Sequence, residues 1–220
     1  MQTEVNNSSI RVLLADDHEV TRAGLRTILE SADDIEVVGE AIDGDQARQL
    51  VGELNIDVLL LDLKMPGLPS FEVEKWVRQY YPEVITLILT AHDRDFYLAN
   101  MMEAGASGYL SKSERAEKLV AAIRRAVSGE LLFTDEQIDR VQQWNRKVGK
   151  RWESLTKRER QTLSLLVQGL DNAQIATALG ITDRTSAFHV SNIIRKLGVN
   201  SRQEAIGWAI KHIPDLGDNL

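Results

Sequence analysis

Short apolar runs alternate with longer amphipathic segments through the first 127 residues. The runs predict five buried strands: Ile10–Ala15, Ile35–Val38, Val58–Leu61, Val84–Leu89 and Gly108–Leu110. Apolar residues at helical spacing predict five helices, which follow the strands in turn: Thr21–Leu29, Asp45–Leu54, Glu72–Tyr80, Phe96–Ala104 and Glu114–Val127. This alternation predicts an α/β fold, a doubly wound five-stranded parallel sheet with helices on both faces.

The pattern changes after Ser128-Gly129. The next segment is polar, but five apolar residues recur in it at spacings of three or four: Ile138, Val141, Trp144, Val148 and Trp152. This spacing predicts one linker helix with a single apolar stripe. Two interpretations stay open, a helix docked on a neighbouring domain and a helix that forms a dimer.

The last part of the chain has only helical patterns. Thr156 and Glu159 have the spacing of a capping box, and glycines at 169, 180 and 198 follow periodic runs as they do at helix ends. We therefore expect a second, all-α domain of four helices. The predicted organisation is a disordered tail 1–9, the α/β domain 10–127, a partly helical linker 128–152, the helical domain 153–213 and a tail 214–220.

The net charge of −7 is unevenly distributed. Residues 1–130 hold 23 acidic and 13 basic side chains, whereas residues 151–220 hold 7 and 9. This asymmetry predicts two domains with different partners and leaves room for a local nucleic-acid site in the second. The chain has no cysteine and no apolar run of the ~20 residues that span a bilayer, and its first ten residues are polar, without the basic-then-apolar layout expected of a secretion signal. We expect a cytoplasmic protein without membrane contact.

Polar side chains end several of the predicted strands. Asp16 and Asp17 follow the first strand, Asp62 the third, Thr90 the fourth and Lys112 the fifth. Because the carboxyl ends of parallel strands share one edge, we expect these groups to converge. Clustered carboxylates favour a hard cation such as Mg²⁺, and such a site suits phosphoryl transfer onto a carboxylate. A helix cap, a strand-end threonine or a surface lysine would explain each residue singly, but not their joint placement.

A helix–turn–helix follows in the second domain. A short helix ends at Gly180, a turn covers Ile181 to Thr185, and a second helix runs to Gly198. The second helix of such a motif enters the major groove of DNA.

Residues 10–127 resemble the receiver domain of bacterial two-component response regulators. The resemblance rests on the strand-end residues named above and on the turn Met65-Pro66-Gly67. It implies a flavodoxin-like strand order 2-1-3-4-5. It also implies Asp62 as phosphoacceptor and Mg²⁺ held by Asp16, Asp17, Asp62 and the Lys64 backbone carbonyl. Thr90, Tyr109 and Lys112 would stabilise the phosphoryl group and switch the domain. Two departures are Ser113, where relatives have a cis-proline, and Ser70, where many have glycine.

Residues 153–211 resemble LuxR-type DNA-binding domains, so the whole chain is similar to NarL/FixJ-type regulators. Thr182 or Asp183 is expected to cap the second helix. The expected DNA contacts are Arg184, Thr185, Phe188, Ser191, Asn192, Arg195 and Lys196. Ala187 replaces a lysine of relatives, which removes one contact and is expected to weaken binding. Phe188 has two interpretations, contact with a thymine methyl and partial burial against the bundle or a partner.

The resemblance implies a transcription regulator. A sensor histidine kinase would phosphorylate Asp62, and Tyr109 would repack. This change would free the helical domain, favour dimers, or both, and the chain would bind double-stranded promoter DNA, with a homodimer expected on activation or on DNA. Its only chemistry would be self-catalysed phosphotransfer and autodephosphorylation. One alternative is a Mg²⁺-dependent aspartyl-phosphate enzyme, but Asp62-Leu63-Lys64 lacks its second carboxylate. The other is a phosphorylation-controlled protein-interaction module in which Ala187 has weakened DNA contact.

Overall fold

The computed structural model describes residues 9–214 and 216, and it divides into two compact units. The boundary between the units lies between Ile138 and Asp139, inside the segment expected to be a linker. The two expected tails lie almost entirely outside the described residues. Each unit is described by itself.

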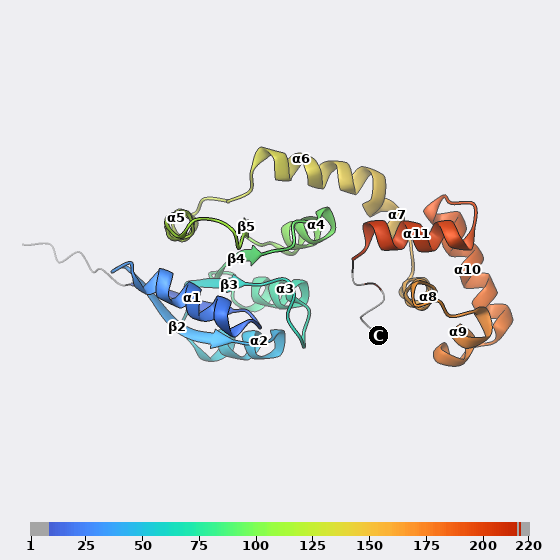
Figure 1. The fold of residues 1–220 in the computed structure, drawn as a ribbon, viewed down its shortest axis with the longest axis horizontal. Coiled ribbons are helices and arrows are strands. Elements are labelled where there is room, and N and C mark those ends of the chain that lie inside the picture. The colour runs from blue at the N-terminus through green and yellow to red at the C-terminus, as the bar shows by residue number, and fades with distance from the viewer. Residues whose placement is uncertain (1–8, 215, 217–220) are drawn as a thin grey trace, which may run out of the picture. The chain divides into compact units, whose positions relative to one another are not determined.

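The first unit contains a parallel sheet with the strand order β2-β1-β3-β4-β5 (Figure 1). The strands are β1 (Ile10–Ala15), β2 (Ile35–Ala41), β3 (Val58–Leu61), β4 (Ile85–Thr90) and β5 (Gly108–Ser111). The predicted strands, their order and the fold class are confirmed. Strand β2 continues to Ala41, beyond its apolar run, because residues 39–41 pair with residues 13–15 of β1 after a one-residue shift in register that follows Val12.

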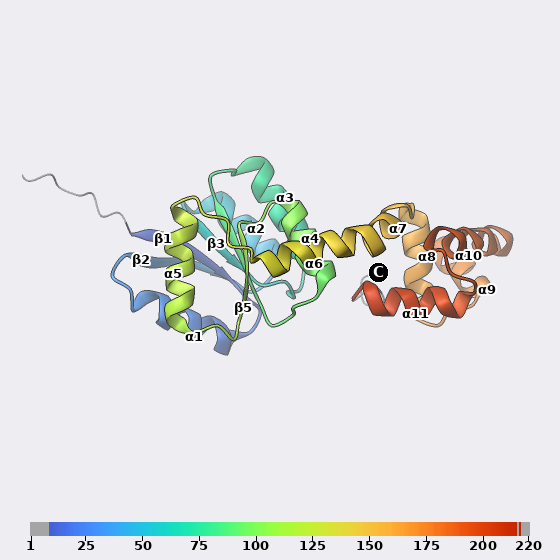
Figure 2. The same ribbon diagram turned by 90° about the horizontal axis from the view of Figure 1, so that it is seen from above.

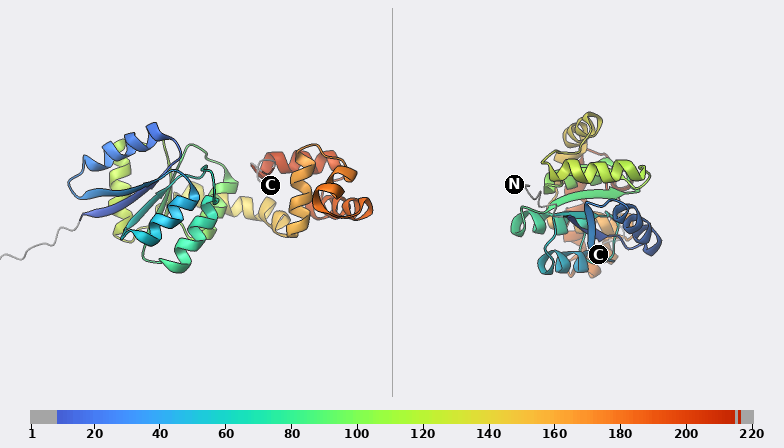
Figure 3. Two further views of the ribbon diagram at one scale, coloured as in Figure 1. Left: turned by 90° about the horizontal axis from the view of Figure 1, so that it is seen from below. Right: turned by 90° about the vertical axis from the view of Figure 1, so that its left-hand side faces the viewer.

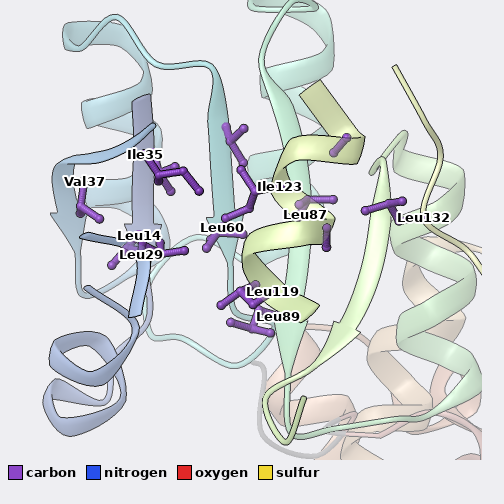
Figure 4. Close-up of a cluster of buried hydrophobic side chains, with 14 residues drawn as sticks. Leu14, Leu29, Ile35, Val37, Leu60, Leu87, Leu89, Leu119, Ile123 and Leu132 are labelled. Carbon is purple, nitrogen blue, oxygen red and sulfur yellow. The ribbon is translucent and has the colours of Figure 1, made fainter. Parts of the chain in front are cut away.

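Five helices cover this sheet: α1 (Glu19–Glu30), α2 (Gly44–Glu53), α3 (Ser70–Tyr80), α4 (Asp95–Ala104) and α5 (Ala116–Val127). Helices α1 and α5 lie on one face, and α2, α3 and α4 lie on the other (Figures 2 and 3). On the first face, Leu14, Leu60 and Leu87 of the strands pack with Leu29 and Ile123 of the helices (Figure 4). Successive residues of a strand point to opposite faces of the sheet. Because the central strands are continuous apolar runs, they present apolar side chains to both faces.

The linker is helical but not uniform. It comprises α6 (Asp135–Trp144), a π-helical turn η1 (Asn145–Gly149) and α7 (Lys150–Glu153). Trp144 and Val148 of the predicted stripe are buried, whereas Ile138 is exposed. A Cβ on Gly149 would lie 2.9 Å from the Trp144 ring, so the glycine lets the indole approach the backbone.

The second unit also contains four helices around one core: α8 (Lys157–Val167), α9 (Asn172–Leu179), α10 (Asp183–Leu197) and α11 (Arg202–His212). The predicted capping box of Thr156 and Glu159 begins α8. Helix α9 ends at Gly180 in the left-handed conformation, and a short turn leads into α10, which completes the helix–turn–helix. Among the described residues, no helix is long and apolar enough to cross a membrane.

Candidate functional site

Two carboxylates lie at the carboxyl edge of the sheet. Asp16 follows β1 and Asp62 follows β3, and the two residues are 2% and 5% exposed. The Asp16 N–H donates to Ala41 O at 3.0 Å, and the Asp62 N–H donates to Ala15 O at 2.9 Å. These bonds continue the sheet by one residue, so both carboxylates are held by strand geometry rather than by flexible loops.

Lys112 joins the two carboxylates. Its Nζ lies 2.7 Å from Asp16 Oδ2 and 2.8 Å from Asp62 Oδ2. The other oxygen of each carboxylate accepts a local backbone N–H, from His18 to Asp16 Oδ1 at 2.9 Å and from Leu63 to Asp62 Oδ1 at 2.8 Å. Asp16 does not cap helix α1, whose N-cap residue is His18 and which has no side-chain cap bond, so a helix cap does not explain this residue.

Burial and ion pairing oppose each other in this cluster. Burial raises the pKa of Asp62, and the bond from Lys112 offsets this only in part. For Lys112, burial alone would lower the pKa, but the hydrogen bonds to Asp16 and Asp62 outweigh it and the pKa is raised. Lys112 is therefore firmly protonated, and Asp62 depends on nearby positive charge to remain ionised.

The donor set suits a hard divalent cation. Ligand atoms of Asp16, Asp17, His18 and Asp62 all lie within 4.8 Å of one another. Three carboxylates and the single ammonium of Lys112 leave two negative charges, and carboxylate oxygens are ligands that Mg²⁺ accepts. His18, whose Nδ1 lies 2.8 Å from Asp17 Oδ1, was not predicted, although it directly follows the two aspartates in sequence. The Lys64 carbonyl remains a prediction.

Thr90 and Tyr109 meet at His92 rather than at the carboxylates. The Thr90 hydroxyl accepts the His92 N–H at 3.0 Å, and the Tyr109 hydroxyl donates to the His92 carbonyl at 2.6 Å. The Lys112 N–H donates to the Thr90 carbonyl at 2.9 Å. The backbone of His92 thus links the two predicted switch residues, a role that the sequence did not signal.

Two further residues support the loops that carry Asp16 and Asp62. The Ser70 hydroxyl donates to the Asp62 carbonyl at 2.6 Å, a bond that glycine at this position could not make. Arg22 of α1 donates to the Asp16 carbonyl at 2.8 Å and pairs with Glu40 of β2. Ser113, which replaces the cis-proline of relatives, follows Lys112 through a trans bond, since no described peptide bond is cis.

Helix α10 presents one exposed stripe. It consists of Arg184, Phe188, Ser191 and Arg195, spaced by four, three and four residues. Phe188 is 63% exposed, so the interpretation that buries it against its own bundle is wrong. Thr182, not Asp183, is the cap, because its Oγ1 accepts the Thr185 N–H at 3.2 Å.

Lys196, which was expected to contact DNA, makes contacts within the protein. Its Nζ lies 2.7 Å from Glu159 Oε2 and 2.8 Å from the Ser154 carbonyl, inside the helical unit. Glu159 is only 3% exposed, so loss of this ammonium would leave a buried carboxylate with its cap bonds alone. The Lys196 ammonium is therefore engaged within the helical unit, and its contact with DNA stays a prediction.

Comparison with known proteins matches both units. Residues 12–124 match the response regulator receiver domain, and residues 153–209 match the bacterial regulatory proteins of the luxR family. The chain is 33% identical to the transcriptional regulatory protein DegU of Brevibacillus brevis, over 96% of this chain and 98% of DegU. It is 35% identical to the response regulator VraR of Staphylococcus aureus, over 93% and 98%. The crystal structure of ChrA, a response regulator of a heme-sensing two-component system, is 37% identical with a TM-score of 0.53, over 93% and 98%.

Proposed function

The chain belongs to the response regulators that join a receiver domain to a LuxR-type DNA-binding domain, so it is a phosphorylation-controlled transcription regulator and not in general an enzyme. On that premise we propose that Asp62 accepts the phosphoryl group. The observation that carries this proposal is the position of Asp62 at the end of β3, with one oxygen paired to Lys112 beside Asp16. We also propose that residues 10–127 form the receiver, 128–152 the linker and 153–213 the DNA-binding domain.

The proposed donor is a phosphohistidine of a sensor histidine kinase. The bond between phosphorus and the ring nitrogen breaks, the nitrogen keeps the electron pair, and an ionised oxygen of Asp62 forms the new bond to phosphorus. The Lys112 ammonium, 2.8 Å from Asp62 Oδ2, is placed to stabilise the transferred oxygens. Mg²⁺ would be held by Asp16, Asp17, Asp62 and the Lys64 carbonyl, and when bound it would neutralise charge on the phosphoryl oxygens.

The proposed switch begins at Thr90. Its hydroxyl oxygen now accepts the His92 N–H, and its O–H would donate to a negatively charged phosphoryl oxygen, which draws the side chain toward that group. Turning Thr90 toward the new group releases the His92 N–H. Tyr109, whose hydroxyl is bonded to the carbonyl of His92, then repacks. The phosphoryl oxygens supply the contacts that favour one state over the other, as a switch requires.

The proposed DNA-binding surface is the exposed stripe of α10. Arg184 and Arg195 would contact phosphates or guanines, Phe188 and Ser191 would lie between them over base edges, and Thr185 and Asn192 would contribute from the flanks. The unit has only a small excess of basic residues, 9 against 7 acidic in residues 151–220, so one copy has little electrostatic affinity. We therefore propose that a homodimer binds paired half-sites.

The test uses Asp62→Asn. The full-length protein first selects its DNA from a random library, and its affinity is then measured by fluorescence anisotropy with and without phosphoramidate and Mg²⁺. The phosphodonor is expected to strengthen DNA binding by the wild type and by Asp33→Asn, a matched variant at an exposed position. It should leave Asp62→Asn unchanged. Equal stimulation of the Asp62→Asn variant would contradict the proposal.

A further inference from the structure

The chain that leaves α5 returns to strand β5 before it enters the linker. The Leu132 N–H donates to the Ser107 carbonyl at 2.7 Å, and the Tyr109 N–H donates to the Leu132 carbonyl at 3.4 Å. Leu132 is buried in the core beside Leu87 (Figure 4). Gly108 leaves room for it, because a Cβ there would lie 2.8 Å from Leu132 Cβ. A short parallel contact thus ties this segment to the outer edge of β5.

A side chain of α6 makes a second attachment to the same strand. Gln137 Nε2 donates to the Tyr109 carbonyl at 3.1 Å. Its Oε1 accepts the Thr134 N–H at 3.0 Å, and the Gln137 N–H donates to Thr134 Oγ1 at 3.1 Å. Gln137 therefore caps the start of α6 and at the same time binds the first turn of that helix to β5.

Tyr109 is the residue at which these contacts meet. Its hydroxyl is bonded to His92, the residue that also bonds Thr90, and its carbonyl is bonded to Gln137. We infer that Gln137 is a positioning residue that couples the Thr90–His92–Tyr109 switch to the linker helix. This inference rests on the proposed function. A shift of β5 at Tyr109 moves the acceptor of the Gln137 bond, and α6 is the segment through which the chain continues into the second unit.

Gln137→Glu separates the coupling from the helix cap. A glutamate keeps the oxygen that accepts the Thr134 N–H, and glutamate is a favoured residue at this position of a capping box. It has no N–H to donate to Tyr109, and it places a carboxylate against a carbonyl oxygen. Gln142→Glu is the matched control, because it adds the same charge at an exposed position of the same helix.

Hydrogen exchange of the full-length protein tests the inference, with Mg²⁺ and beryllofluoride as the phosphoryl analogue. In the wild type and in Gln142→Glu, the analogue is expected to change exchange in residues 107–112 and also in residues 133–144. In Gln137→Glu, the change in exchange of residues 107–112 should remain. The change in residues 133–144 should fall about fivefold, the factor that corresponds to the loss of one neutral hydrogen bond.

Two results would overturn the inference, and they are distinguishable. If Gln137→Glu transmits the change to residues 133–144 as the wild type does, Gln137 is only a cap and the proposed function is untouched. If the wild type shows no change even in residues 107–112, the proposed phosphorylation switch fails, and the coupling fails with it.

Discussion

At the scale of single residues, Asp62 and Glu74 show two outcomes of burying a carboxyl group. Burial raises the pKa of both. Asp62 has an ammonium at 2.8 Å, whereas Glu74 is paired with Arg78 Nε at 3.4 Å and interacts with the Thr86 side chain, and both contacts lower its pKa less than burial raises it. Glu74 Oε2 and the Thr86 hydroxyl both lack a well-formed hydrogen bond within the described residues. The pKa of Glu74 is raised to about 7, because a protonated carboxyl is easier to bury than an ionised one.

Because the pKa of Glu74 is raised, we expect the stability of the first unit to depend on pH. The folded protein keeps the Glu74 proton up to a pKa of about 7, whereas the unfolded chain loses it near its ordinary value of 4.5. Stability from this group is therefore complete below pH ~4.5 and is lost as the pH rises through 7, by about 3 kcal/mol in total. Glu74→Gln should remove this loss, as measured by urea unfolding between pH 5 and 8. If the free energy of unfolding falls with pH as steeply in this variant as in the exposed control Glu117→Gln, the explanation is contradicted.

The exposed Phe188 ring leads us to expect DNA binding that depends on the methyl group of a thymine. If its exposed ring contacts a thymine methyl in the major groove, replacing that thymine by deoxyuridine removes the contact and changes nothing else. The loss of one buried methyl corresponds to about 0.8 kcal/mol, or about fourfold in affinity. Deoxyuridine is substituted at each thymine of the selected DNA in turn, and the affinity is measured by anisotropy.

The matched variants make the Phe188 prediction specific. Phe188→Ala should no longer respond at the sensitive thymine, whereas Ile210→Ala, at another exposed apolar position, should respond as the wild type does. A wild type that binds all the deoxyuridine sites equally well would exclude methyl contact as the role of Phe188.

At the scale of elements, helix α2 supports the loop that follows Asp62. The Gly44 N–H donates to the Pro66 carbonyl at 3.0 Å, and Asp45 Oδ2 accepts the Leu68 N–H at 3.2 Å. A Cβ at Gly44 would lie 1.8 Å from the Leu68 carbonyl oxygen, so no side chain fits there without displacing the loop. The start of α2 and the loop between β3 and α3 therefore form one packed element.

Gly44→Ala tests this packing. We expect a loss of about 1–3 kcal/mol in the free energy of unfolding, because the clash is with backbone and cannot be relieved by a rotamer. Gly24→Ala is the control, since Gly24 lies in helix α1 with open space around its Cβ position and alanine there should stabilise by about 0.5–1 kcal/mol. Equal stabilities of the two variants in thermal unfolding would show that the loop is not fixed by α2.

The sequence predicted the elements because each carries a local signal. Apolar runs mark the buried strands, and Gly180 marks the end of α9. The contacts between elements have no such signal. Lys196 resembled any exposed base on a recognition helix, and only the fold shows that it binds Glu159, 37 residues earlier. Gln137 is a common polar residue on a polar helix, so its bond to Tyr109 could not be foreseen. The π-helical turn was missed because spacings of three and four do not distinguish it from an α-helix.

At the scale of the whole molecule, each unit has its own buried core, and charge is divided unevenly along the chain, with 23 acidic and 13 basic side chains in residues 1–130 and 7 and 9 in residues 151–220. This division suits a protein in which one part responds to a cation and a phosphoryl group and the other to DNA. The chain connects them through α6, whose first turn is bonded to β5 of the first unit. On the proposed function, a phosphoryl group on Asp62 would act on the linker through Lys112, Thr90, His92, Tyr109 and Gln137.

Reductive trapping tests whether Asp62 is the residue that accepts the phosphoryl group. The full-length protein is incubated with phosphoramidate and Mg²⁺, and borohydride then reduces any aspartyl phosphate to homoserine, which peptide mass spectrometry locates. We predict homoserine at position 62, dependent on both the phosphodonor and Mg²⁺. Homoserine at a different aspartate, or none in protein that circular dichroism shows to be folded, would contradict the account.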